Sequence, residues 1–283
     1  MYAVTGSTGQ LGQLVIKELL GRVPAGQVVA LARNVDKARA ALPSGIVVRR
    51  GDYADLASLD EALKGVERLL LISSSEIGQR ATQHHAVIEA AKRAGVKLIA
   101  YTSLLHADKS PLGLAEEHVA TEAALRASGV PFVLLRNGWY TENYLHGLPG
   151  AVERGALAGA AGTGKIASAS RADYAAAAAV ALTQEGMAGR VLELAGDDAY
   201  TLAELAAAAA KASGKPVAYH DLPQAEYQKV LLGAGLPAPV ASLLADSDHG
   251  ASLGGLYDAS HTLSGLIGRP TTPYEKMVEQ ALG

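Results

Sequence analysis

The glycine-rich turn Gly6-Ser-Thr-Gly9-Gln-Leu-Gly12 is the feature that most restricts what this chain can fold into. An apolar stretch, Tyr2–Thr5, precedes the turn, and an amphipathic stretch follows it. Glycines at this spacing between a strand and a helix allow a tight turn and a close approach of backbone to pyrophosphate. The helix N-terminus adds N–H donors and the positive end of the helix dipole. The alternative is an ordinary β–α turn that happens to hold three glycines, but strand, turn and helix all agree with a dinucleotide site.

The first 135 residues alternate short apolar runs with amphipathic stretches. The predicted strands are Tyr2–Thr5, Val28–Ala32, Ile46–Arg50, Leu69–Ile72, Leu98–Thr102 and Phe132–Arg136. Helical spacing of apolar residues fills the intervals, at about 11–20, 55–64, 81–94 and 115–128. Strict alternation of strand and helix predicts an α/β fold with a doubly wound, Rossmann-like parallel sheet.

The alternation of strand and helix patterns ends after Arg136, and alanine-rich helical patterns and glycine-rich stretches follow. We expect a dinucleotide-binding domain at 1–136 and a smaller, mostly helical C-terminal lobe at 137–283, with some segments returning to the main sheet. The glycine-rich stretches Gly147–Gly164 and Ser247–Gly255 are predicted to be loops. Thr201 and Glu204 have the spacing of a capping box at a helix start.

Composition narrows the class of protein. The net charge is −3 and there is no long basic run, so nothing points to nucleic acid as a partner. The chain has no cysteine, no leader-like N-terminus and no apolar run of the length of a membrane span, which together predict a cytoplasmic protein. We predict no metal site, because no histidine–carboxylate grouping has zinc-like spacing, and the adjacent His84 and His85 cannot share one helix face.

The end of the second predicted strand selects the dinucleotide. NAD-binding proteins usually place Asp or Glu there to bind the ribose 2′-hydroxyl, but here the strand ends in Arg33. A guanidinium can hold a 2′-phosphate with two charge-assisted hydrogen bonds, so NADPH is predicted as the cofactor, unless Arg33 is only a solvated surface residue. Ser73, Ser74 and Ser75 end the fourth strand, where small hydroxylated residues leave room for a ribose, although serines also favour turns.

The sequence lacks the Tyr-x-x-x-Lys pair that many short-chain dehydrogenases use to protonate a ketone, because none of the eleven tyrosines has a lysine four residues later. A quinone needs that proton donor less, since hydride transfer leaves a delocalised, phenolate-like anion. The segment from Asn137 to Tyr144 is rich in aromatic and asparagine residues, and Tyr140 and Asn143 could bind a flat ring and its oxygen. Trp139 could equally fill a gap in the core. His118, in the helix after the fifth strand, is a third catalytic candidate, although a lone helical histidine is more often merely solvated.

Four segments together resemble the NmrA-like branch of the atypical short-chain dehydrogenases, and within it a bacterial group of NAD(P)H:quinone reductases. They are Val4–Gly12, Leu69–Ser75, Tyr101–His106 and Leu135–Tyr144. The resemblance implies a flavin-free reductase that passes hydride from NADPH to a small quinone, with a cleft between the lobes. Where plant relatives have a helical lysine, this chain has His118, which leaves the role of proton donor open. The cofactor contacts carried over by the resemblance are Gly6, Ser7, Thr8, Gly9, Gln10, Leu11, Arg33, Ser73, Ser74, Ser75, Asn137, Gly138, Trp139, Tyr140, Thr141 and Glu142.

We therefore expect an NADPH-dependent quinone reductase, with a small-molecule quinone as substrate and His118, Tyr140 and Asn143 as the catalytic candidates. A homodimer is compatible with this interpretation. The alternative is an NADP(H)-binding redox sensor of the NmrA-like type, which acts through protein contacts and would show no turnover. An epimerase or ketone reductase is disfavoured by the absent tyrosine–lysine pair.

Overall fold

The computed structural model describes residues 1–76 and 78–283. The chain forms two compact units, each assembled from several segments. The first unit comprises residues 1–104, 116–137 and 171–192, and the second comprises residues 105–115, 138–170 and 193–283. Neither unit is a single continuous stretch. The boundary that the sequence places between residues 136 and 137 stays a prediction.

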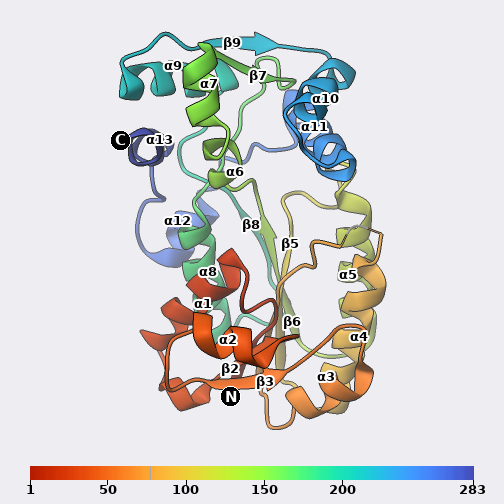
Figure 1. Ribbon diagram of the computed structural model, residues 1–283. Helices are drawn as coiled ribbons and strands as arrows, with labels where there is room; N and C mark the ends of the chain where they lie inside the picture. The colour runs from red at the N-terminus through yellow and green to blue at the C-terminus, as the bar shows by residue number, and fades with distance from the viewer. Residues whose placement is uncertain (77) are drawn as a thin grey trace. The chain divides into compact units, whose positions relative to one another are not determined.

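The main sheet has seven strands in the order β3-β2-β1-β4-β5-β6-β8 (Figure 1). Its strands are β1 (Tyr2–Val4), β2 (Val28–Ala32), β3 (Val47–Arg50), β4 (Arg68–Leu71), β5 (Leu98–Leu104), β6 (Phe132–Asn137) and β8 (Val191–Leu194). The pairings from β3 to β6 are all parallel. The doubly wound α/β fold predicted from the sequence is confirmed, and the six predicted strands agree with β1 to β6 to within two residues at each end.

Helices cover both faces of this sheet in the first unit. They are α1 (Gln10–Leu20), the short 3-10 helix η1 (Ala25–Gln27), α2 (Val35–Ala41), α3 (Leu56–Ala62), α4 (Arg80–Arg93), α5 (Ala115–Ser128) and α8 (Arg171–Thr183). Figure 1 shows α1 and α8 on one face and α3, α4 and α5 on the other. All five residues of β2 are buried, as expected for a strand covered on both sides. A core of buried apolar residues joins the strands to α3, α4 and α5, and Leu59, Ile88 and Leu125 belong to the same cluster as Leu69 and Ile99.

The strand order brings two loops together. β1 pairs with β2 on one side and with β4 on the other, so the chain reverses its direction of winding at β1. The loops that follow β1 and β4 then leave the carboxyl edge of the sheet on opposite sides of a crevice, the usual binding place of open α/β sheets. The position of the glycine turn therefore follows from the pairing of β1 with β4.

The second unit is mostly helical, as predicted, with one small parallel sheet formed by β7 (Ala156–Gly159) and β9 (Ala218–Asp221). Its helices are α6 (Glu142–Leu145), α7 (Leu148–Arg154), α9 (Leu202–Ser213), α10 (Gln224–Gly233), α11 (Ala238–Ser252), α12 (Thr262–Ile267) and α13 (Tyr274–Leu282). The predicted capping box is confirmed, because the Thr201 side chain accepts from the Glu204 N–H and the Glu204 side chain accepts in return from Thr201.

Two predicted loops were wrong. The stretch Gly147–Gly164 contains helix α7 and strand β7. The stretch Ser247–Gly255 begins inside α11, which continues to Ser252. The polar and glycine residues of α11 look like loop residues, but Gly250 is buried where a Cβ atom would lie 2.7 Å from Leu112 Cδ1. Close packing, which the local sequence does not show, explains why glycine and polar residues occur in this helix.

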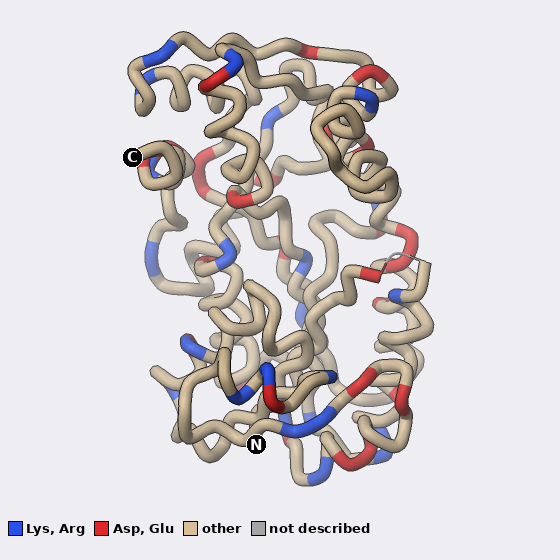
Figure 2. The backbone as a smooth tube through the Cα atoms, in the orientation of Figure 1, with Lys and Arg blue, Asp and Glu red and all other residues tan. Residues whose placement is uncertain are grey.

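Charged residues of both signs are interspersed along the described chain (Figure 2). Among the helices of residues 1–76 and 78–283, none is both long enough and apolar enough to cross a membrane.

Candidate functional site

The turn between β1 and α1 has the geometry of an anion cradle. Gly6 adopts a positive φ of 56°, which side-chain-bearing residues rarely tolerate, and the Gly9 N–H donates to the Gly6 carbonyl at 2.9 Å. Gly6 and Gly9 are exposed, whereas Ser7 is buried and donates its hydroxyl to the Leu31 carbonyl at 2.7 Å. The Ser7 side chain thus ties the turn to β2, and the exposed glycine backbone is left to approach a ligand.

Gly12 lets helix α1 lie directly on this turn. A Cβ atom at Gly12 would lie 2.3 Å from the Gly6 carbonyl oxygen and 2.8 Å from Ser7 Cα, which are contacts that no real structure can accommodate without a shift. The N-cap of α1 is Gly9, which has no side chain to cap the helix. The first turn of α1 therefore offers backbone donors and the positive end of the helix dipole at the sheet edge. A pyrophosphate fits this arrangement.

The pairing of β1 with β4 brings the serine loop beside the glycine turn. Thr5, which directly follows β1, accepts a hydrogen bond on Oγ1 from the Ile72 N–H at 2.9 Å. A Cβ atom at Gly6 would lie 3.6 Å from Ile72 Cβ. Ser73 and Ser74 are half-buried and Ser75 is exposed. The structure thus brings together two stretches that the sequence analysis assigned separately to the cofactor.

Arg33 lies at the tip of β2 and is 72% exposed at its side chain, so its guanidinium can reach an incoming group. It is not merely solvated, because Nη1 lies 3.3 Å from Oε1 of Glu76. The same carboxylate accepts from Gln83 Nε2 at 2.7 Å on Oε2. Glu76 was missed in the sequence analysis, because it lies in the loop after β4 and nothing in its local sequence marks a partner on β2.

His118 is buried in the first unit on α5, with its Nδ1 2.7 Å from the Tyr101 hydroxyl. Burial lowers the pKa of His118 to about 3, so the ring is neutral at pH 7. Any proton that His118 delivered at that pH would come from the neutral imidazole. Its role in proton transfer stays a prediction.

Asn137 ends β6 opposite Leu104 of β5 and is buried. Its Oδ1 has no hydrogen-bond partner among the described residues. An unsatisfied buried amide oxygen carries a free-energy cost of about 1–3 kcal/mol, which a ligand that supplies an N–H would remove. A carboxamide N–H is such a donor, so this atom is compatible with the cofactor contact expected at Asn137.

In the second unit, the chain after β6 runs as an extended segment before it enters α6. Thr141 donates its N–H to the Ala169 carbonyl at 3.0 Å, and the Ala169 N–H donates to the Trp139 carbonyl at 3.1 Å. Trp139 is buried, whereas Tyr140 and Asn143 are partly exposed. The backbone hydrogen bonds fix the segment, and the two catalytic candidates keep part of their surface accessible.

Asp248 is a functional candidate that the sequence analysis missed, because the stretch around it was taken for a loop. It is buried in α11, accepts from the Tyr144 hydroxyl at 3.0 Å and accepts from the Ala160 N–H at 3.1 Å. Burial raises the pKa of Asp248 to about 6, while these two hydrogen bonds lower it. Because Tyr144 belongs to α6, Asp248 holds the short helix that also carries Asn143.

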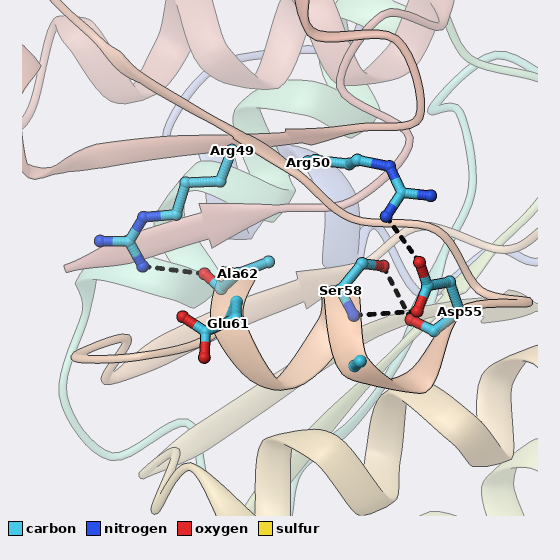
Figure 3. Close-up of a pocket in the computed structure, with 7 residues that line it drawn as sticks. Arg49, Arg50, Asp55, Ser58, Glu61 and Ala62 are labelled. Atoms are coloured by element: carbon cyan, nitrogen blue, oxygen red, sulfur yellow. Dashed lines mark hydrogen bonds and ion pairs between the residues drawn. The ribbon is translucent and has the colours of Figure 1, made fainter.

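A hollow lies between β3 and α3 (Figure 3), and its Arg50 pairs in register with Ala32, the residue before Arg33. Its two arginines are engaged by the chain itself, since Arg50 Nη1 lies 2.6 Å from Asp55 Oδ2 and Arg49 donates to the Ala62 carbonyl at 2.8 Å. Asp55 is also the N-cap of α3, because its Oδ1 accepts from the Ser58 N–H at 3.1 Å. We assign no ligand to this hollow.

Comparison with known proteins agrees with the geometry of the glycine turn. Residues 6–185 match the family model described as NAD(P)H-binding. The chain belongs to the NAD(P)H-binding family. Within this family it is 60% identical to quinone oxidoreductase 2 of Escherichia coli strain K12 over 278 residues, which cover 98% of this chain and 97% of that protein.

Two solved structures share the NAD(P)H-binding fold over the whole chain. The NADPH-dependent quinone oxidoreductase QOR2 from Escherichia coli, complexed with NADPH, is 59% identical and superposes with a TM-score of 0.98, with 100% of both chains covered. The Citrobacter sp. triphenylmethane reductase complexed with NADP(H) is 41% identical, with a TM-score of 0.96 and 100% of both chains covered. The resemblance noted in the sequence is therefore confirmed.

Proposed function

We propose that this chain is an NADPH-dependent quinone reductase that transfers hydride to a small quinone without a flavin. The observation that carries the proposal is the 60% identity to quinone oxidoreductase 2 over 98% of the chain. The glycine turn, with its exposed backbone and its Cβ-free contact between Gly12 and Gly6, supports the same conclusion independently.

NADPH would be held by residues whose chemistry matches its parts. The backbone of Gly6 to Leu11 would bind the diphosphate, Arg33 the 2′-phosphate, and Ser73 to Ser75 a ribose. The buried Oδ1 of Asn137 and the following residues as far as Glu142 are proposed to complete the contacts. When bound, NADPH supplies a hydride. The Arg33–Glu76 pair must open for the 2′-phosphate, at a small cost because exposed ion pairs contribute only about 0–1 kcal/mol.

The residues proposed beside the acceptor are Tyr140 and Asn143. Tyr140 offers a flat face for an aromatic ring, and the Asn143 amide can donate to an oxygen that gains negative charge. The chain lacks the Tyr-x-x-x-Lys pair, so a quinone, whose reduced anion depends less on a proton donor than an alkoxide does, is the acceptor that this set of residues suits. His118 remains the proposed proton-transfer candidate, to be judged by substitution.

NADPH oxidation by the purified protein tests the proposal directly. The loss of NADPH absorbance is followed with a panel of small benzoquinones and naphthoquinones, with simple ketones as the carbonyl control. We expect turnover with quinones and none with ketones. Protein that binds NADPH but turns over no quinone would refute the proposal and favour the redox sensor.

A triphenylmethane dye belongs in the same panel, because a relative at 41% identity is named as a reductase of such dyes. Reduction of the dye at a rate comparable to that of quinones would widen the substrate class to conjugated planar acceptors. A homodimer and a cytoplasmic location stay predictions, which chromatography with light scattering and cell fractionation can test.

A further inference from the structure

The loop after β4 is held by side chains through its backbone. Ser73 donates its N–H to Thr102 Oγ1 at 2.8 Å, and Ser74 donates its N–H to His84 Nε2 at 2.9 Å. The Ser74 carbonyl accepts from Arg80 Nε at 2.7 Å. Both peptide groups that flank the Ser74 Cα are thereby clamped from α4. The conformation of this loop is thus dictated by buried side chains of neighbouring elements.

The hydrogen bonds around His84 assign its tautomer. Thr121 donates its hydroxyl to the Glu117 carbonyl at 2.9 Å, within α5. The Thr121 oxygen is then left to accept from His84 Nδ1, which lies 3.0 Å away. Nδ1 must carry the proton, and Nε2 must offer the lone pair that accepts from Ser74. The neutral Nδ1–H form therefore relays a chain of hydrogen bonds from α5 to the serine loop.

The surroundings of His84 keep the ring neutral and fixed in place. The side chain is completely buried, and Tyr101 packs edge-on against the ring with 5.3 Å between centroids. Arg80, on the same helix, carries a positive charge that disfavours a second one on the ring. Its Nη1 lies 3.4 Å from Oε2 of Glu117 on α5. A proton on Nε2 would point at the Ser74 N–H, a donor facing a donor, and the clamp would open.

We propose that His84 is a positioning residue for the cofactor, because its neutral Nδ1–H tautomer holds Ser74 in the conformation that receives a ribose of NADPH. The proposal rests on the proposed function, which assigns Ser73 to Ser75 to the cofactor. His84 does not touch the reacting atoms in this scheme. It acts through the backbone of Ser74 and should control cofactor affinity rather than the chemical step.

Substitution of His84 separates positioning from chemistry. His84→Phe keeps an aromatic ring but removes the acceptor, and should raise the NADPH dissociation constant about tenfold, with kcat at saturating NADPH and the quinone KM changed less than about twofold. His84→Gln restores an acceptor of similar reach and should recover most of the affinity. The matched control is His85→Ala, because His85 is the adjacent but exposed histidine of α4. NADPH fluorescence gives the dissociation constants, and thermal unfolding shows which variants are folded.

A second measurement is made on the wild-type protein without cofactor. Long-range ¹H–¹⁵N correlation spectra of the wild-type protein at pH 7 report the tautomer of each histidine, with His84 assigned by its absence in His84→Gln. The Nδ1–H form of His84 supports the proposal, and the Nε2–H form overturns it even if His84→Phe fails to fold. Unchanged NADPH affinity in a folded His84→Phe also overturns it. If the wild-type protein itself binds no NADPH, the proposed function fails instead, and the tautomer measurement still stands.

Discussion

Arg33 Nη1 lies 3.3 Å from Oε1 of Glu76, so the cation at the tip of β2 is paired with a carboxylate from the loop after β4. Both side chains are about half-exposed or more, and such pairs contribute little to stability. The pair has another consequence. A carboxylate that shares a guanidinium with a 2′-phosphate competes with it and repels it, so Glu76 should weaken the preference for NADPH that Arg33 creates.

Substitution of Arg33 should reduce NADPH affinity far more than NADH affinity. Arg33→Ala is expected to raise the NADPH dissociation constant by roughly tenfold or more, because charge-assisted hydrogen bonds contribute about 1.5–3 kcal/mol each. Arg33→Lys should recover only part of the loss, since an ammonium cannot bind bidentately. Fluorescence titration with both dinucleotides measures the effect. An unchanged NADPH dissociation constant in Arg33→Ala would show that the 2′-phosphate is bound elsewhere.

Substitution of Glu76 should act in the opposite direction. Glu76→Gln removes the competing charge and should tighten NADPH binding about two- to fivefold, the range that an exposed ion pair allows. Glu116→Gln makes the same charge change on an exposed part of α5 and serves as the control. The same titration is used at low salt, where screening is weakest. Equal effects of the two variants would mean that only net charge matters.

The contact between Gly12 and the glycine turn should be intolerant of a methyl group. Gly12→Ala would place Cβ 2.3 Å from the Gly6 carbonyl, so we expect α1 to shift and NADPH affinity to fall by roughly a hundredfold, with a loss of about 1–3 kcal/mol of stability. Gly26→Ala is the control, because no atom lies within 4 Å of its added Cβ. Calorimetric titration and thermal unfolding report the two effects. Normal NADPH binding by Gly12→Ala would remove the close helix contact from the description of the site.

Asn143→Ala should affect the chemical step without affecting the cofactor. Loss of one donor to a developing oxyanion typically costs roughly a hundredfold in kcat, and we expect a decrease of about tenfold to a hundredfold for a quinone. Tyr140→Phe should leave the quinone KM almost unchanged, because the ring face is retained. His146→Ala, at the exposed C-terminal end of α6, is the control. His118→Ala, assayed alongside, decides whether that residue takes part in proton transfer. A weakened NADPH affinity with normal kcat would assign Asn143 to the cofactor instead.

Buried His84 should make the stability of the protein sensitive to acid. Its pKa is lowered to about 3 by burial and by the charge of Arg80, whereas in the unfolded chain it titrates near 6.5. The unfolded state therefore takes up a proton below pH 6.5 that the folded state refuses, so the contribution is fully present above that pH and is lost as the pH falls toward 3.

Urea unfolding of wild type and His84→Gln at pH 7.5 and pH 5.0 isolates this contribution. Between these two pH values His84 should cost the wild-type protein about 2 kcal/mol that His84→Gln does not lose, because each pH unit below 6.5 is worth about 1.4 kcal/mol. The comparison cancels other groups, such as Asp248, whose raised pKa of about 6 works in the opposite direction. Identical pH dependence in the two proteins would mean that His84 protonates normally in the folded state.

Local pattern determined much of this protein. The alternation of strand and helix, the glycine turn and the arginine that ends β2 are properties of neighbouring residues, and they predicted the fold, the turn geometry and the cofactor. These features depend on backbone sterics and on periodicities of two and 3.6 residues, which act within one element. The family resemblance rested on the same segments.

Tertiary structure decided which side chains meet. Arg33 and Glu76 are 43 residues apart, and Tyr144 and Asp248 are 104 apart. His84 obtains its tautomer from Thr121, which lies on a different helix. The polar and glycine residues around Asp248 have the composition of a loop, so the sequence predicted one there. They form the end of α11 because they are buried by tertiary packing. Hydrogen bonds of this kind depend on the order in which strands pair and on how helices pack on them, and neither is recorded in the spacing of residues along one element.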